Sequence, residues 1–214
     1  RHNVIPAPRT IYQGIRKLLP ASYVCLNLDH LQSGQLPDAE RYWKLESCFE
    51  SRSGYTLESA ADELEGLLKQ SVGDQMVSDV PLGAFLSGGI DSSTVVGIMQ
   101  SLASQPVRTF SIGFHEEGFN EAEHAAAVAK HLGTEHTELY VTEGEARDLV
   151  PQIPGIYDEP FADSSQIPTF LVSQMTRKHV TVALSGDGGD ELFCGYTRYP
   201  GMLNAWNNRS SVTG

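Results

Sequence analysis

From residue 57 onward, the apolar positions alternate between the spacing of helices and the spacing of strands. Leu57 to Val72 carries leucine and alanine along one helix face, and Thr56 is placed to cap that helix. Val80 to Leu86 is a short apolar run, which favours a strand buried on both faces. The same reasoning predicts the later elements in order: helix 91–102, strand 107–113, helix 120–132, strand 135–141, helix 145–153, helix 167–178 and strand 180–184.

Repeated strand–helix–strand units predict an α/β fold with a parallel sheet and helices on both of its faces. Ligands bind such sheets at the carboxyl ends of the strands, near the point where the strand order reverses. Two glycine-rich segments, Ser87–Ser93 and Ser185–Glu191, each follow a predicted strand. Their shared placement predicts that both segments contribute to one site.

The first fifty residues lack this alternation. Tyr23–Leu28 has the pattern of a strand, Ser33–Gly34 marks a turn, and the chain then returns toward Tyr42–Trp43. We expect residues 1–50 to be a small β-rich unit, or the tail of one, that ends in a polar linker at 50–54. Residues 51–214 are predicted to form the second domain.

The composition is that of an ordinary globular protein of 214 residues, 40% hydrophobic and 20% charged. Its net charge of −12 argues against broad binding to nucleic acid or to an anionic membrane. No apolar run approaches the ~20 residues that span a bilayer. The chain has an odd number of cysteines with no C-x-x-C spacing: Cys25, Cys48 and Cys194. We therefore expect buried thiols in a reducing, cytoplasmic environment.

The segment Ser87–Ser93 reads S-G-G-I-D-S-S. Its glycines let the backbone turn tightly and approach an anion, and successive N–H groups at a helix start attract phosphate. The hydroxyls of Ser87, Ser92 and Ser93 could add donors. Asp91 would repel a phosphate, and its presence is explained if it holds Mg²⁺ that bridges to phosphates. The absence of a following lysine excludes the G-x-x-x-x-G-K-S/T loop.

The segment Ser185–Glu191 reads S-G-D-G-G-D-E and holds three acidic residues. A solvated acidic turn is the usual interpretation of such a cluster, and the spacing does not fit an EF-hand calcium loop. Beside the first glycine-rich segment, however, it can supply a second carboxylate for Mg²⁺.

These two segments carry a family resemblance. The pattern S-G-G-x-D-S-S/T resembles the loop of the N-type ATP pyrophosphatases (PP-loop), which bind the pyrophosphate end of ATP and cleave between its α and β phosphates. The run S-G-D-G-G-D-E-L-F-C-G-Y, at Ser185–Tyr196, resembles the second signature of the glutamine-hydrolysing asparagine synthetase family, and Ser87–Ser93 resembles its first. Further segments that resemble the family are Phe110–Phe114 and Tyr157–Ser165, and, at the end of its glutaminase domain, Ile11–Pro20 and Tyr42–Trp43.

The resemblance implies a role for individual residues of a Mg²⁺–ATP site. The residues implied to contact the adenosine or α-phosphate are Leu86, Ile112, Ser185 and Gly186. Those implied to hold the pyrophosphate are Ser87, Gly88, Gly89, Asp91, Ser92 and Ser93. Asp91 and Asp190 would bind Mg²⁺, and Asp187, at a position that is often Glu, would assist proton transfer or amine recognition. Those implied to lie near the substrate are Asp158, Asp163 and Ser164.

The implied reaction has two parts. A carboxylate, expected to be the aspartate side chain, attacks the α-phosphate of ATP and pyrophosphate leaves; ammonia then converts the acyl-adenylate to an amide and AMP. In the full enzymes ammonia comes from glutamine through an N-terminal Cys, and a helical region follows the segment that resembles this chain. Both are missing from these 214 residues, so we expect an excised core with little turnover of its own.

Several alternatives stay open. A relative could act on another carboxylate, in β-lactam or peptide cyclisation or in sugar-acid amidation. A tRNA-thiolating or NAD-forming pyrophosphatase is a second class, against which the Ser185 segment argues. A nucleotide-binding module without turnover is a third. The expected partners are small molecules rather than nucleic acid or membrane, and a homodimer of the full-length parent is left open.

Overall fold

The computed structural model describes residues 3–49, 54–115 and 121–208. The chain divides into two compact units. We call Arg1–Ala60 with Asp148–Gln166 the N-terminal unit, and Ala61–Arg147 with Ile167–Gly214 the sheet unit. The predicted linker at 50–54 lies, except for Gly54, outside the described residues. The sequence analysis did not predict that residues 148–166 belong to the same compact unit as residues 1–60.

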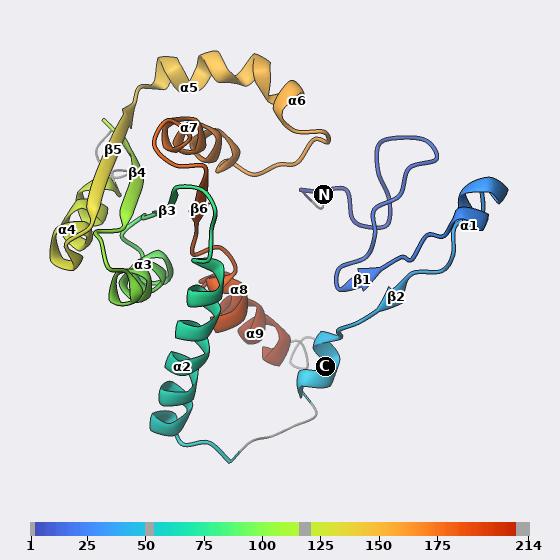
Figure 1. Cartoon of the computed structure of the whole chain (residues 1–214), viewed down its shortest axis with the longest axis horizontal. Coiled ribbons are helices and arrows are strands. Elements are labelled where there is room, and N and C mark those ends of the chain that lie inside the picture. The colour runs from blue at the N-terminus through green and yellow to red at the C-terminus, as the bar shows by residue number, and fades with distance from the viewer. Residues whose placement is uncertain (1–2, 50–53, 116–120, 209–214) are drawn as a thin grey trace. The chain divides into compact units, whose positions relative to one another are not determined.

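The sheet unit is built on four parallel strands in the order β5-β4-β3-β6 (Figure 1). This confirms the predicted α/β fold with a parallel sheet. The strands are β3 (Leu82–Phe85), β4 (Arg108–Phe114), β5 (Glu135–Val141) and β6 (Val182–Leu184). The helices are α2 (Leu57–Gln75), α3 (Ile90–Leu102), α4 (Ala122–Leu132), α5 (Glu143–Leu149), α7 (Gln166–Thr176), α8 (Gly189–Phe193) and α9 (Arg198–Asn208).

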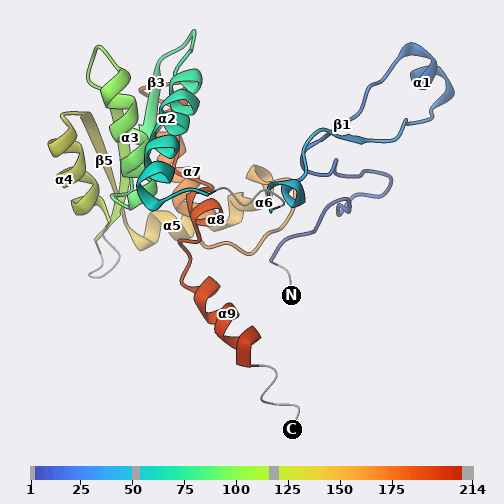
Figure 2. The same ribbon diagram turned by 90° about the horizontal axis from the view of Figure 1, so that it is seen from below.

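Successive strand residues point to opposite sides of this sheet, so both of its faces are apolar. Helices bury both faces. Ala84 packs with buried residues of α2, α3 and α4, among them Val96 and Met99. Its neighbour Phe85 packs on the opposite side, where Phe110 meets α7. Figures 1 and 2 show α3 and α4 on one side of the strands and α7 on the other.

The helix ends follow local sequence signals. The Ser59 amide donates to the Thr56 hydroxyl at 3.1 Å, which is the N-cap bond expected from the sequence. Gly133 ends α4 in the left-handed conformation, as predicted. The described part of α4 begins at Ala122, and the predicted start at Asn120 lies outside the described residues. The helix predicted at 145–153 is present as α5, a 3₁₀ turn (Val150–Gln152) and α6 (Ile153–Ile156).

The N-terminal unit contains little regular structure in its first fifty residues. Strands β1 (Ser22–Tyr23) and β2 (Glu40–Arg41) pair antiparallel, and a 3₁₀ turn spans Leu45–Phe49. The strand predicted over 23–28 is wrong beyond Tyr23, because Leu28–Ser33 forms helix α1. Asn27 caps that helix: its side chain accepts from the His30 amide at 2.9 Å, a local bond that outweighs the strand pattern.

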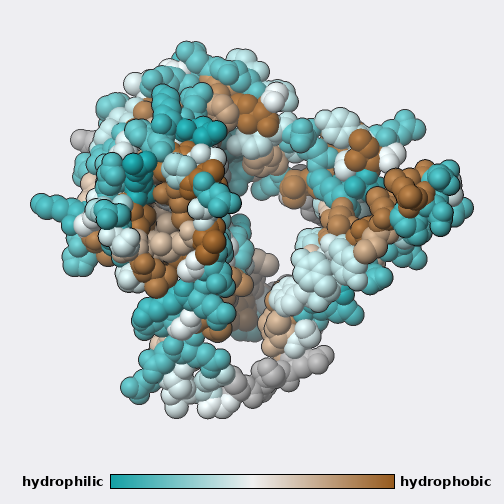
Figure 3. All heavy atoms as spheres, viewed as in Figure 1, coloured by the Kyte–Doolittle hydropathy of each residue, from teal (hydrophilic) through white to brown (hydrophobic). Residues whose placement is uncertain are grey.

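Residues 3–49 contain no buried side chain among those that the structure describes. On the face shown in Figure 3, apolar atoms gather over α1, where Leu28 and Leu31 are largely exposed. Cys25, Cys48 and Cys194 are also exposed, so the prediction of buried thiols is wrong. Two of these cysteines lie in this segment, which packs no core around them. In the described parts of the chain, no helix combines the length and apolarity needed to cross a bilayer.

The core of the sheet unit can be tested by truncating a methionine. Met99 of α3 is 1% exposed, so Met99→Ala should lower the free energy of unfolding by about 2–5 kcal/mol. Met202 of α9 is 67% exposed and serves as the control, because Met202→Ala should change it by less than about 0.5 kcal/mol. Urea unfolding followed by circular dichroism measures both. Equal losses would contradict the assigned core.

Candidate functional site

The strand order defines a switch point between β3 and β6. From β3 the chain moves through β4 to β5 at one edge, and it then returns to place β6 on the other side of β3. The pairing Ala84↔Leu184 aligns the ends of the two strands. The loops that follow these strands therefore diverge from one point at the carboxyl end of the sheet, where ligands of such folds bind. These are the two glycine-rich segments singled out in the sequence.

A cavity of about 670 Å³ opens at this point, within the sheet unit. Both glycine-rich segments line it, together with the end of β3, the middle of β4 and the first turns of α7. The residues predicted from the sequence that line the cavity are Leu86, Ser87, Gly89, Asp91, Ser92, Ile112, Ser185, Gly186, Asp187 and Asp190. The structure thus gathers segments that lie about a hundred residues apart in the sequence.

The loop Ser87–Ser93 is held in shape by hydrogen bonds of its own serine hydroxyl groups. Ser92 Oγ lies 2.9 Å from Ser87 Oγ, accepts from the Ser87 amide at 3.2 Å, and donates to the Gly89 carbonyl at 3.3 Å. The Gly89 amide donates to Ser87 Oγ at 3.2 Å. These bonds fix the turn that leads into α3. The side chain of Ser92 therefore serves the shape of the loop, a role that the sequence pattern did not distinguish from ligand binding.

Two predicted residues of the first loop do not line the cavity. Gly88 has a φ of +80°, and a β-carbon there would lie 2.7 Å from the Ala125 amide nitrogen. Glycine is thus needed for the left-handed turn and for close packing on α4. Ser93 Oγ is buried, with no hydrogen-bond partner among the described residues. Its predicted role in binding pyrophosphate stays a prediction.

The second loop touches the first turn of α3. A β-carbon on Gly186 would lie 2.7 Å from the Ser92 amide nitrogen, which shows how closely the two backbones approach. A β-carbon on Gly189 would collide with the Asp91 carboxylate. Asp187 accepts a hydrogen bond from Ser185 Oγ at 3.1 Å. The glycines of S-G-D-G-G-D-E therefore bring the Asp91 carboxylate against the backbone of the turn that carries Asp187 and Asp190.

The cavity has an unusual charge distribution. Its described lining contains four carboxylates, from Glu121, Asp91, Asp187 and Asp190, and neither Lys nor Arg. The N-terminus of α3 also opens here, capped by Gly89 without a side-chain bond. Among the described residues, the amides of the first helical turn, at residues 90–92, have no hydrogen-bond acceptor. Free amides favour an anion at this end of the helix, whereas the carboxylates favour a cation.

A half-buried histidine supports one wall of the cavity. His136 Nδ1 lies 2.8 Å from Thr109 Oγ1, and its Nε2 lies 3.1 Å from the hydroxyl of Ser111, which lines the cavity. Thr134 extends this chain of polar groups through a 2.9 Å contact with Thr109 Oγ1. Burial lowers the pKa of His136, although nearby Glu138 and a bond with Thr109 partly oppose this. The neutral imidazole bridges β4 and β5 beneath Ser111.

The residues predicted to lie near the substrate belong to the N-terminal unit. Asp158 and Ser164 are exposed, and Asp163 accepts from the Ser165 amide at 2.8 Å. Hydrogen bonds from Ser165 lower the pKa of Asp163. Their predicted contact with substrate stays a prediction.

Several lining residues were not foreseen. The lining residues to which the sequence assigned no role are Phe85, Ile90, Phe110, Ser111, Glu121, Pro168, Thr169, Val172, Phe193 and Gly195. Pro168 and Thr169 lie in the first turn of α7, which the sequence predicted as a helix. The strand order that brings this turn to the cavity was not visible in the sequence pattern.

The parallel sheet, its switch point and the two glycine-rich turns define an α/β domain with a cavity at the carboxyl end of the sheet. Comparison with known families is specific: the model for asparagine synthase matches residues 63–213. The chain belongs to the asparagine synthase family.

Individual relatives agree with this assignment. A Methanocaldococcus jannaschii protein with a provisional name as glutamine-hydrolysing asparagine synthetase 2 is 42% identical over 193 residues, which are 90% of this chain and 36% of that protein. Glutamine-hydrolysing asparagine synthetase 1 of Bacillus subtilis is 36% identical over 196 residues, covering 91% of this chain and 29% of that protein. The chain thus spans about a third of the length of these relatives.

Comparison with solved structures finds the NH₃-dependent NAD synthetase of Campylobacter jejuni, in complex with nitrate. It is 14% identical, with a TM-score of 0.43, and the match covers 63% of this chain and 60% of the other.

The burial of His136 predicts a dependence of stability on pH. Because its pKa is lowered in the folded state, the unfolded chain binds a proton at higher pH than the folded chain does. Stability should therefore fall as the pH drops below about 6.5, the ordinary value for histidine. The His136→Gln variant should show a shallower loss of unfolding free energy between about pH 7 and 5. His131→Gln, at an exposed histidine of α4, should keep the wild-type slope, and identical slopes for all three proteins would refute this prediction.

The close approach of the two loops predicts the effect of a single methyl group. In Gly186→Ala the added β-carbon would meet backbone atoms of α3 that cannot move aside, so unfolding free energy should fall by about 1–3 kcal/mol. Gly201 of α9 has open space around it, and Gly201→Ala should not destabilise the protein. Chemical denaturation compares the two variants. A neutral Gly186→Ala would show that the loops are further apart.

Proposed function

We propose that this chain is the ATP-binding core of an amide-forming ligase. In this proposal a carboxylate attacks the α-phosphate of ATP, pyrophosphate leaves, and ammonia converts the acyl-adenylate to an amide and AMP. Membership of the asparagine synthase family supports the reaction class. The names of the relatives support the aspartate side chain as the carboxylate and glutamine as the source of ammonia.

The single observation that carries the proposal is the pairing of free amides with carboxylates in one cavity. A nucleotide triphosphate is an anion, and four carboxylates with no lysine or arginine in the described lining would repel it. The repulsion is relieved if a divalent cation binds between carboxylates and phosphates. The amides at the start of α3 would then contact the phosphates directly.

The residues present fit Mg²⁺ bound in this way. Among the described residues, no cluster of three or more acidic, histidine or cysteine side chains could hold a metal by itself. Mg²⁺ characteristically binds through one or two carboxylates plus substrate phosphates, with water in the remaining positions. Of the four carboxylates in the described lining, we assign Asp91 and Asp190 to the metal, because they are the two that the resemblance to the family implies as its ligands. When bound, Mg²⁺ would neutralise charge on the pyrophosphate as it leaves.

The other groups of the site bind and orient. Ser87 and Gly89 would hold the pyrophosphate at the start of α3, and Leu86 and Ile112 would pack on the adenosine. Ser185 and Gly186 would meet the α-phosphate side. Holding both reactants in one geometry lowers the barrier by removing the entropy cost of bringing them together. Asp158, Asp163 and Ser164 are proposed to lie near the carboxylate substrate.

Asp187 is proposed to assist proton transfer or recognition of the amine. Its carboxylate lies in the cavity lining and accepts a hydrogen bond from Ser185 Oγ. Ammonia loses one proton as the amide forms, and a carboxylate within reach can accept that proton. Ser185 would fix the orientation of that carboxylate.

The function is tested by isotope exchange between pyrophosphate and ATP, in the protein that contains this chain, with aspartate and a panel of other carboxylic acids. We expect exchange that requires Mg²⁺ and is largest with aspartate. Asp91→Asn should reduce exchange by at least about a hundredfold, since one charged metal ligand is lost, with an unchanged circular dichroism spectrum.

Asp74→Asn, at an exposed aspartate of α2, is the matched control and should exchange as the wild type does. Exchange that persists in Asp91→Asn would refute the metal assignment. Nucleotide binding without exchange, for every acid tested, would refute the proposed ligase activity.

A further inference from the structure

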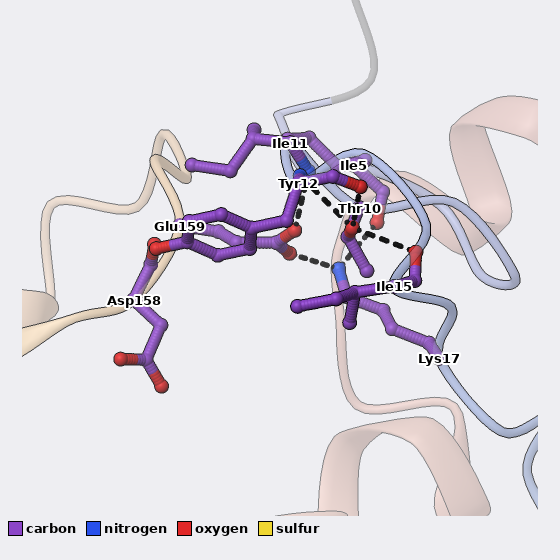
Figure 4. Close-up of polar contacts among 8 residues, drawn as sticks. All are labelled: Ile5, Thr10, Ile11, Tyr12, Ile15, Lys17, Asp158 and Glu159. Carbon is purple, nitrogen blue, oxygen red and sulfur yellow. Dashed lines mark hydrogen bonds and ion pairs between the residues drawn. The ribbon is translucent and has the colours of Figure 1, made fainter.

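The N-terminal unit contains a network of polar contacts whose centre, Glu159 and Lys17, has no role in the proposed reaction. It joins two segments far apart in the sequence, residues 3–17 and residues 157–166, which belong to the same unit. Figure 4 shows the centre of this network, where Glu159 points toward Lys17 and the backbone of Ile11. We call residues 3–17 the brace and residues 157–166 the braced segment.

Glu159 is held at both of its carboxylate oxygens. Oε1 accepts from the Ile11 amide at 2.9 Å, and Oε2 forms an ion pair with Lys17. The Glu159 side chain is only 16% exposed, and the hydrogen bond from Lys17, followed by that from Ile11, lowers its pKa. Lys17 Nζ also donates to the Ile5 carbonyl at 2.9 Å, so the cation is tied to the brace itself.

Two further bonds surround this ion pair. The Tyr12 hydroxyl donates to the Asp158 carbonyl at 2.9 Å, and the Ala162 amide donates to the Asn3 carbonyl at 2.6 Å. Within the brace, Thr10 Oγ1 donates to the Ile15 carbonyl at 3.0 Å and so holds the turn that presents Ile11 and Tyr12. The contacts reach three positions of the braced segment, which restrains its whole first half.

The braced segment leads directly into α7. The Tyr157 hydroxyl donates to the carbonyl of Gln166, the first residue of α7, at 2.9 Å. The Gln166 side chain donates to the Asp163 carbonyl at 2.9 Å, which closes the segment on the helix start. The same helix carries Pro168 and Thr169, which line the cavity. The braced segment itself carries Asp158, Asp163 and Ser164, the residues proposed above to lie near the carboxylate substrate.

We propose that Glu159 is a positioning residue, through which the brace sets the conformation of residues 157–166, the segment that leads into α7. Glu159 itself does not contact substrate. Its charge fixes the braced segment and, with it, Asp158, Asp163 and Ser164, which are proposed above to lie near the carboxylate substrate. The kinetic consequence of this inference rests on the function proposed above, whereas the structural consequence does not.

The kinetic test compares KM values in the exchange assay. Glu159→Gln and Lys17→Met should each raise the KM for the carboxylate about tenfold and leave the KM for ATP within about twofold, as expected for loss of one charged hydrogen bond. The double variant should be no worse than either single one, because both remove the same ion pair. Lys17→Arg, which keeps the charge, should behave as the wild type does.

The control breaks a different ion pair. Glu65→Gln removes the exposed contact between Glu65 and Lys69 on α2 and should leave both KM values unchanged. Tyr12→Phe removes a single bond to the braced segment and provides a milder variant if Glu159→Gln does not fold. An unchanged KM for the carboxylate in Glu159→Gln, Lys17→Met and Tyr12→Phe, alongside active wild type, would overturn the inference.

Hydrogen–deuterium exchange separates this inference from the proposed function. Without any ligand, the backbone amides of residues 157–166 should exchange faster in Glu159→Gln than in the wild type, while those of α2 should be unchanged. This result is expected even if the wild type shows no ATP–pyrophosphate exchange, in which case only the proposed function fails. Equal amide exchange in both proteins would overturn the inference whatever the kinetics show.

Discussion

The close approach of two backbones at the switch point determines the rest of the site. Parallel pairing of β3 with β6 brings the loop at Gly186 against the first turn of α3, with no space for a side chain between them. Only this contact allows Asp91 and Asp190, from loops far apart in the sequence, to face one cavity. The core on both faces of the sheet holds the strands in register, and it therefore indirectly holds the carboxylates.

The sequence predicted the parts of the fold that local patterns determine. Each strand of the sheet and the helices between them follow from apolar spacing, and the meeting of the two glycine-rich loops follows from their position after strands. The prediction of a strand at 23–28 was wrong because Asn27 caps a helix that begins at Leu28. Its capping hydrogen bonds cannot be read from the spacing of apolar residues. Two contacts depend on the three-dimensional arrangement of the chain: that of the Ser92 hydroxyl with Ser87 and the ion pair of Glu159 with Lys17. The spacing of residues along the sequence does not predict either contact.

The two units obtain their order by different means. The sheet unit buries apolar side chains against both faces of its strands. Residues 3–49, by contrast, bury none of their described side chains, and the part nearest the chain start is ordered by polar bonds to residues 157–163. A single hydrogen bond contributes only about 0.5–1.5 kcal/mol to stability, and its strength depends on its geometry. A core shares its stabilisation among many packed side chains. The conformation of this segment is therefore more sensitive to the loss of one bond than that of the sheet is.

The strand order also has a consequence for folding. The strands β3, β4 and β5 can pair as soon as the chain has passed Val141, but β6 at the edge beside β3 is made last and closes the largest loop in the sheet. Such long-range pairing is intrinsically slow. The second glycine-rich loop takes its place in the cavity only once β6 has paired with β3. A ligand that contacts both loops binds only the completed sheet, and it would hold the short strand β6 in place by mass action.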